Sequence, residues 1–140
     1  MERCNSILCF KFDDFEGLPS EPDEAVLSKE QTDCNGNIWQ LVLYPGGKSL
    51  SRGDDNDGES LTLLSVYLIN KGKHDKQVKY SFILRNASGL DENEHQVRVG
   101  VIKGGRELGT NKFIKRSFVL DKTNNVLFKG SLIIDVDIQN

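Results

Sequence analysis

Two aspartates and a glycine in the chain match part of a calcium-binding loop. Asp55, Asp57 and Gly58 match the third, fifth and sixth positions of the helix–loop–helix calcium motif. The first ligand position falls on Gly53 and the bidentate last position falls on Leu64, and neither residue has a side-chain oxygen. We therefore expect this segment to be a solvated acidic loop, because runs of charge usually form solvent-facing surfaces.

A glycine-rich stretch at Gly104–Gly109 has spacing similar to that of a phosphate-binding loop. Such a loop continues with a lysine and then a serine or threonine, whose ammonium and hydroxyl groups bind the phosphates and the metal ion. Thr110 and Asn111 occupy those positions here. The stretch therefore does not predict a nucleotide site.

The cysteines and histidines also form no recognisable catalytic or metal-binding pattern. The odd number and irregular spacing of Cys4, Cys9 and Cys34 favour reduced thiols in an intracellular protein. His74 and His95 lie in polar segments. Neither has another histidine or cysteine nearby at the sequence spacing that is typical of metal ligands. A cysteine–histidine nucleophile pair would have Cys34 as its one candidate. We expect no catalytic residue, no bound metal, no cofactor and no enzymatic activity.

The composition favours one globular domain that binds neither nucleic acid nor membrane. The chain has 140 residues, of which 37% are hydrophobic and 28% charged, and its formal net charge is −3. Nucleic-acid-binding domains are usually basic, and the basic segment Lys71–Lys79 is typical of an exposed hairpin turn. No segment approaches the roughly 20 apolar residues of a membrane span, and no signal-peptide pattern is present. We predict a cytoplasmic location, with the nucleus as an alternative.

The strongest structural pattern is the segment Ile38–Tyr44, which contains the single tryptophan. Trp39, Leu41 and Leu43 alternate with the other residues at the two-residue period of a β-strand. The segment Pro45–Gly47 follows, and proline and glycine are typical of a turn that ends a strand. We predict a core strand here, with a buried indole ring.

Similar alternation predicts at least five further strands joined by polar segments. They are expected at Ile7–Phe12, Leu61–Ile69, Val78–Leu84, Gln96–Ile102 and Leu132–Ile138. Ala25–Leu27 is either a strand or a helical turn, and Lys103–Asn111 is predicted to be a loop. Short strands without a helical period are typical of an antiparallel β-sandwich. We expect one such domain over residues 7–138, with flexible ends at 1–6 and 139–140.

The alternation also assigns the two faces of each strand. The residues assigned to the core are Leu64, Val66 and Leu68 in one strand and Val97, Val99 and Val101 in another. Tyr67 is then on the outward face of the first strand, and Gly100 and Ile102 lie opposite the valines. Tyr80 shares a face with Phe82 and Leu84, which makes it a candidate core residue.

Several segments, in order along the chain, carry the motifs of a known domain family. Trp39–Gly47 follows the pattern Trp-x-Leu-x-Leu-Tyr-Pro-x-Gly, and Leu64–Leu68 and Val78–Asn86 continue it. Leu108–Arg116 is similar to a Trp-Gly-x-x-Lys-Phe-Ile-x-Arg segment. The other matching segments are Phe10–Gly17, Val119–Asn125 and Leu132–Val136. Over residues 7–138 the chain resembles the MATH domain, also called the TRAF-homology domain.

The resemblance implies an eight-stranded antiparallel sandwich that binds short extended peptides of other proteins in a shallow groove. Members of the family occur in signalling adaptors, in substrate receptors of cullin ubiquitin ligases and in deubiquitinases. Carried over by position, the groove residues would be Tyr67, Tyr80, Gly100, Ile102, Arg106, Glu107, Leu108, Gly109 and Thr110. The expected function is therefore that of a non-enzymatic protein–protein interaction module.

The chain departs from the family pattern at the groove itself. The Trp-Gly-aromatic loop of the family is Leu108-Gly109-Thr110 here, and an aromatic residue expected near Gly100 is missing. Aromatic side chains are frequent binding hot spots. The alternative interpretation is a structural sandwich that self-associates and has no working peptide groove.

Overall fold

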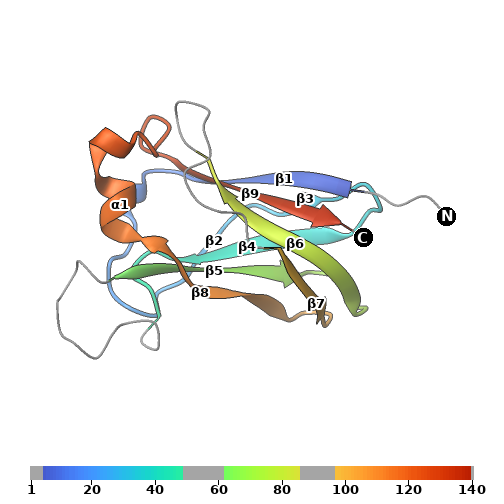
Figure 1. The fold of residues 1–140 in the computed structure, drawn as a ribbon. Helices are drawn as coiled ribbons and strands as arrows, with labels where there is room; N and C mark the ends of the chain where they lie inside the picture. Colours follow the sequence, from blue (N-terminus) through green and yellow to red (C-terminus); the bar gives the residue numbers. More distant parts are fainter. Residues whose placement is uncertain (1–4, 49–61, 86–96, 140) are drawn as a thin grey trace.

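The computed structural model describes residues 5–48, 62–85 and 97–139, and these residues form nine strands and three short helical segments (Figure 1). The strands are β1 (Asn5–Phe12), β2 (Val26–Leu27), β3 (Gln31–Thr32), β4 (Ile38–Tyr44), β5 (Leu63–Asn70), β6 (Lys76–Leu84), β7 (Arg98–Ile102), β8 (Glu107–Lys115) and β9 (Leu132–Gln139). The helical segments are η1 (Phe15–Gly17), α1 (Arg116–Leu120) and η4 (Lys122–Asn124). The acidic segment considered for calcium falls mostly outside the described residues.

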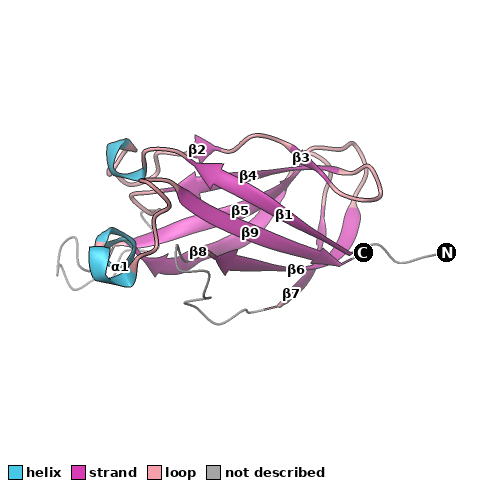
Figure 2. Ribbon diagram, turned by 90° about the horizontal axis from the view of Figure 1, so that it is seen from above, coloured by secondary structure: helices cyan, strands magenta, loops and turns pink. Residues whose placement is uncertain are grey.

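The strands make two antiparallel sheets that pack on one another (Figure 2). The first sheet has the order β1–β9–β6–β7. The second has the order β2–β4–β5–β8, and the short strand β3 also pairs with β4. The predicted all-β antiparallel sandwich is confirmed, and the described residues contain nine strands where about eight were expected.

The first and last strands of the chain are neighbours. β1 and β9 pair from Asn5 opposite Gln139 to Phe12 opposite Leu132. The paired strands therefore begin before residue 7 and end after residue 138, the limits predicted for the domain.

The core between the sheets consists of the alternating apolar residues of the strands. Residues with no exposed surface include Phe10, Trp39, Leu41, Leu43, Leu64, Val66, Leu68, Ile134 and Ile138. The predicted burial of the Trp39 indole and the predicted core face of Leu64, Val66 and Leu68 are thereby confirmed. Tyr80 is only 4% exposed and packs against Phe82 with ring centres 5.6 Å apart, so it belongs to the core.

A buried carboxylate organises the turn before β4. Oδ1 of Asp33 accepts hydrogen bonds from the backbone N–H groups of Asn35 and Asn37, each over 2.9 Å. Oδ2 accepts a hydrogen bond from the indole nitrogen of Trp39, also over 2.9 Å. Gly36 at the tip of the turn has a φ of 82°, which glycine adopts without steric cost. The turn is thus connected directly to the central core side chain.

The two described cysteines are in different states. Cys34 is disulfide-bonded, so the expectation that all the cysteines are reduced is wrong for this residue. Cys9 is a free, exposed thiol on β1. Spacing along the chain does not reveal which cysteines approach in space. The disulfide also removes the support that reduced thiols gave to an intracellular location.

The predicted loop at Lys103–Asn111 is wrong in its second half, where β8 begins at Glu107. β8 is an outer strand of the second sheet and pairs with β5, with a register irregularity between Leu64 and Val66. Glu107, Gly109 and Asn111 are of residue types that are depleted in strands, so local sequence gives little indication of the strand. The pairing with β5 holds this segment extended instead.

The predicted faces of β7 are also wrong. Val97, Val99 and Val101 are 58%, 64% and 51% exposed, whereas Ile102 is completely buried. A short terminal strand has only one neighbour, so the face that it buries depends on how it meets the rest of the sandwich. The inward face here carries Gly100 and Ile102.

The segment after β8 closes the end of the sandwich that lies opposite both chain termini (Figure 1). Val119 of α1 and Val126 after η4 are buried in the core. Arg116 donates a hydrogen bond from Nη1 to the carbonyl oxygen of Pro45 over 2.7 Å, and its guanidinium lies 5.1 Å from the ring centre of Phe15. Within the described residues, no helix is long and apolar enough to cross a membrane.

Candidate functional site

The outer face of the second sheet presents an aromatic residue at its centre. Tyr67 of β5 lies between Val42 of β4 and Gly109 of β8, its partners in the two neighbouring strands. The adjacent residues Val66 and Leu68 are fully buried in the core, so Tyr67 projects from the opposite face. The predicted outward orientation of Tyr67 is confirmed.

Gly109 provides the space in which the Tyr67 side chain lies. A Cβ atom at position 109 would stand 2.1 Å from the carbonyl oxygen of Val66 and 2.9 Å from Cδ1 of Tyr67. No larger residue fits at this position without moving the backbone or the ring. The glycine of the sequence motif is therefore required by the close approach of β8 to β5.

Tyr44 and Lys48 complete an aromatic and cationic cluster with Tyr67. The two tyrosine rings meet edge to face, with centres 5.9 Å apart and planes at 87°. The ammonium group of Lys48 lies 5.0 Å from the Tyr44 ring centre and 4.9 Å from the Tyr67 ring centre, within the range of cation–π attraction. We call Tyr44, Lys48, Tyr67 and Gly109 the Tyr44–Tyr67 surface.

The environment of the surface raises the pKa of both phenols, which are protonated at neutral pH in any case. Partial burial, the neighbouring Tyr44 and the carboxylate of Glu107 raise the pKa of Tyr67 above its usual value. Partial burial, Glu107 and Asp23 likewise raise the pKa of Tyr44. Each hydroxyl group can therefore donate a hydrogen bond at neutral pH, beside an apolar ring and a cation.

The structure places most of the predicted groove residues along β8, but of those in this strand only Glu107 and Gly109 share the face of Tyr67. Glu107, Leu108, Gly109 and Thr110 are consecutive on β8, Arg106 precedes them, and Tyr67 lies beside Gly109 on β5. Leu108 is 38% exposed at the margin between the sheets. Its Cδ1 atom lies 3.1 Å from the position that a Cβ of Gly100 would occupy. The outer strands β7 and β8 of the two sheets therefore meet at these two residues.

Two of the predicted groove residues lie in the core instead. Ile102 has no exposed surface and Tyr80 is 4% exposed. Burial is the largest cause of the raised pKa of Tyr80, and Arg98 acts in the opposite direction. Neither side chain is accessible for direct contact with a peptide in this structure.

Sequence reasoning did not select Tyr44 or Lys48. Tyr44 is two residues from Val42, so the same alternation places both on the outer face of the sheet. The pairing of β4 with β5 then brings Tyr44 close to Tyr67. Lys48 follows a turn, and no periodic pattern indicates where its side chain lies.

The Tyr44–Tyr67 surface offers several kinds of contact to another molecule. In the part of the chain that the structure describes, no three histidine, cysteine, aspartate or glutamate side chains gather as metal ligands. Aromatic rings, a cation and protonated hydroxyl groups on an open sheet face can contact an extended chain through apolar, cation–π and hydrogen-bond interactions. No known protein family matches the chain, and no curated protein matches it either.

Proposed function

We propose that the protein is a non-enzymatic interaction module that binds short extended peptides across the Tyr44–Tyr67 surface. The observation that carries the proposal is the pair of outward tyrosine rings that share Lys48 above the backbone of Gly109. Tyrosine is enriched at binding hot spots because a rigid ring and a hydroxyl group contribute together. The resemblance of the sequence to MATH domains supports the same choice.

The charges around the surface favour a peptide of mixed character. Lys48 would attract an acidic or hydroxyl-bearing peptide residue, and Glu107 and Arg106 at the start of β8 would contact opposite charges farther along. The tyrosine rings would cover an apolar peptide residue between them. A shallow surface of this kind would bind weakly on its own and gain strength from multiple copies.

The resemblance also suggests where such a module acts. Substrate recognition for a ubiquitin ligase, a deubiquitinase or a signalling adaptor would require this kind of weak and selective peptide contact. A cytoplasmic or nuclear location fits those roles and remains part of the proposal.

The direct test is an NMR titration of the isotope-labelled full chain with an array of extended peptides that includes serine- and threonine-rich sequences. We expect amide shifts at Tyr44, Lys48, Tyr67, Gly109 and Thr110. Replacement of the ring in Tyr67→Ala should weaken binding by about tenfold, as expected for a central hot spot.

Two matched variants separate the roles of ring, hydroxyl and charge. Tyr67→Phe keeps the ring, so it should bind more strongly than Tyr67→Ala. Lys48→Gln should lower the affinity for acidic peptides. Lys73→Gln, at an exposed lysine in the β5–β6 loop, should leave that affinity unchanged. Saturating peptides that leave the Tyr44–Tyr67 surface unshifted would refute the proposal.

A row of exposed valines favours a second candidate function, self-association. Val99 and Val101 of β7, a terminal strand of the first sheet, and Val97 just before it are all more than half exposed. Such a strand can pair with the same strand of another copy. Sedimentation equilibrium should then show a dimer that Val99→Lys disrupts. Ile7→Lys, at an equally exposed residue of the opposite terminal strand β1, is the control.

A further inference from the structure

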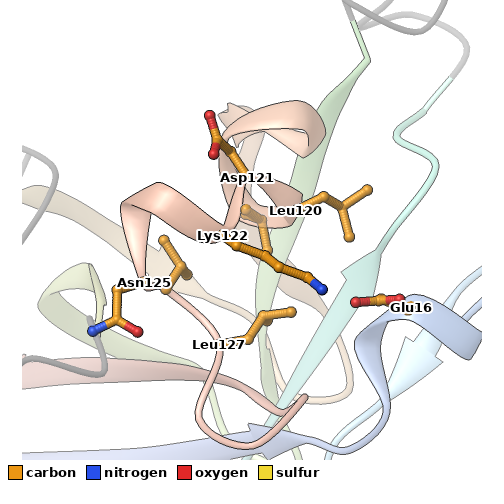
Figure 3. Close-up of a pocket in the computed structure, with 8 residues that line it drawn as sticks. Glu16, Leu120, Asp121, Lys122, Asn125 and Leu127 are labelled. Carbon is orange, nitrogen blue, oxygen red and sulfur yellow. The ribbon is translucent and has the colours of Figure 1, made fainter.

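A cavity at the α1 end of the sandwich is separate from the Tyr44–Tyr67 surface, and Figure 3 shows its narrower part. Its open part has a volume of about 360 Å³ and is lined by Glu16, Arg116, Leu120 and Lys122. A narrower recess of about 120 Å³ adjoins it and extends to Leu127. Both parts share Glu16, Leu120 and Lys122, so one ligand could occupy them together.

Opposite charges face this cavity from its two sides without forming a pair. The side chain of Lys122 extends from η4 toward Glu16 of η1 (Figure 3). Neither side chain forms a hydrogen bond or an ion pair with another residue of the described chain. The cavity therefore presents one available cation and one available anion.

The other charged groups nearby already have partners. Arg116 donates to the carbonyl oxygen of Pro45. The carboxylate of Asp121 accepts hydrogen bonds from the backbone N–H of Thr123 over 3.0 Å and from its hydroxyl group over 2.7 Å. These bonds lower the pKa of Asp121 and hold its carboxylate within its own turn. Glu16 and Lys122 are therefore the charged side chains that line both parts of the cavity and lack a partner among the described residues.

The floor of the cavity is apolar. Leu120 and Leu127 are partly buried and pack on the core, and Val119 and Val126 beneath them are almost fully buried. An aliphatic group in the recess would cover leucine surface that otherwise contacts water, which is favourable. A ligand that matches the cavity has an aliphatic side chain between a negative group and a hydrogen-bond donor.

We propose that the cavity binds the C-terminal residue of a partner polypeptide in which that residue is aliphatic. The terminal carboxylate contacts the ammonium group of Lys122. The backbone N–H of the same residue donates to the carboxylate of Glu16, and the side chain enters the recess between Leu120 and Leu127. Capture of a free chain terminus is a general mode of peptide recognition.

The shape of the cavity favours a polypeptide over a free amino acid. The recess has room for one aliphatic side chain, while the larger part opens to solvent beside Arg116. The preceding residues of a bound chain can leave through that opening. None of the lining residues belongs to the Tyr44–Tyr67 surface, so the proposal does not depend on peptide binding there.

The test compares three probes by NMR titration of the labelled full chain. They are the peptide N-acetyl-Gly-Ser-Gly-Ser-Leu with a free C-terminus, the same peptide with a C-terminal amide, and free leucine. The free-acid peptide should shift the amides of Leu120, Lys122 and Leu127. The amidated peptide should bind about fivefold more weakly because it lacks the charge that Lys122 contacts.

Variants of the cavity test the assigned contacts. Lys122→Gln should lower the affinity for the free-acid peptide by about threefold. The effect is small because the charge pair is exposed to solvent. Lys122→Arg keeps the charge and should retain most of the affinity. Lys129→Gln, at an exposed lysine on the next turn, should change nothing. Unperturbed spectra elsewhere would show that each variant is folded.

Three results would overturn the proposal. Equal affinity of the acid and the amide would remove the role of the carboxylate. Shifts confined to the Tyr44–Tyr67 surface, or no shifts at all, would remove the cavity as the site. Free leucine that binds as tightly as the peptide would exclude a polypeptide as the preferred ligand.

Discussion

The indole nitrogen of Trp39 donates a hydrogen bond over 2.9 Å to Oδ2 of Asp33, six residues earlier in the chain. Trp39 is fully buried and Asp33 is 5% exposed. A buried indole N–H requires an acceptor, and a buried carboxylate requires donors. This hydrogen bond gives the indole its acceptor and, with those from the backbone of Asn35 and Asn37, fixes the β3–β4 turn to the core.

We predict that Asp33→Ala destabilises the fold by about 2 kcal/mol, because it leaves the indole and two backbone donors without their acceptor. Urea unfolding followed by the fluorescence of Trp39 would measure the change. Glu24→Ala, at an exposed carboxylate, should alter the free energy of unfolding by less than about 0.5 kcal/mol. Equal stability of the two variants would contradict this role of Asp33.

Asp33 should also make the fold sensitive to acid. Burial, the largest single influence, raises the pKa of Asp33, but the hydrogen bonds from Trp39, Asn37 and Asn35 together lower it below the usual value. A carboxyl group with a lowered pKa in the folded state stabilises the fold above its unfolded pKa, which is about 3.9. That contribution disappears as the pH falls through the lower, folded pKa.

The unfolding free energy of the wild type should therefore decrease below about pH 4. Asp33→Asn removes the ionisable group, so its stability should change less over the same interval. Urea titrations between neutral and acidic pH would give both curves. Parallel curves would show that other carboxylates determine the acid response.

The reactivity of Cys9 should depend on the carboxylate beside it. Cys9 of β1 is the register partner of Asp135, whose Oδ2 accepts a hydrogen bond from Nε of Arg85. Partial burial and the negative Asp135 raise the pKa of the Cys9 thiol above its ordinary 9.0, while Arg85 acts in the opposite direction. Alkylation requires the thiolate, so Cys9 should react slowly at neutral pH.

Substitutions of the two partners should have opposite effects on this thiol. Asp135→Asn should lower the pKa of Cys9 and accelerate alkylation by iodoacetamide, whereas Arg85→Gln should raise the pKa and retard it. Mass spectrometry of the peptide that contains Cys9 would follow the reaction against pH. Changes of the same sign in both variants would indicate altered exposure rather than an electrostatic effect.

Gly109 and Gly100 should differ sharply in their tolerance of alanine. The added Cβ at position 109 would overlap the backbone carbonyl of Val66, and we expect a loss of about 3 kcal/mol. The added Cβ at position 100 would meet only the end of the flexible Leu108 side chain. Thermal unfolding of Gly109→Ala and Gly100→Ala would test this difference, and similar melting temperatures would contradict it.

Strand periodicity predicted the central part of the fold well. The strands that contain Trp39, Leu64 and Ile134 have a neighbour on both sides, so their buried faces follow the alternation of large apolar residues. The outer strands β7 and β8 did not follow their local sequence. Their extent and orientation depend on pairing with β6 and β5, which a single segment does not encode.

The candidate site was predictable only in part for the same reason. Tyr67 and Gly109 lie on paired strands, and the sequence motifs selected both. Lys48 reaches the tyrosine rings from a turn, and the cavity at Glu16 and Lys122 joins segments far apart in the sequence. Contacts between residues so far apart in the sequence arise only when the strands assemble into the sandwich, so local patterns do not predict them.

The pairing of β1 with β9 has a mechanical consequence. Asn5 and Gln139 are register partners, and both chain termini emerge from the same end of the domain (Figure 1). Traction on the two termini would separate the antiparallel strands from that end, breaking the hydrogen bonds between them one after another rather than all at once. Force applied to both termini would therefore separate β1 from β9 at low force, starting at the Asn5–Gln139 pair.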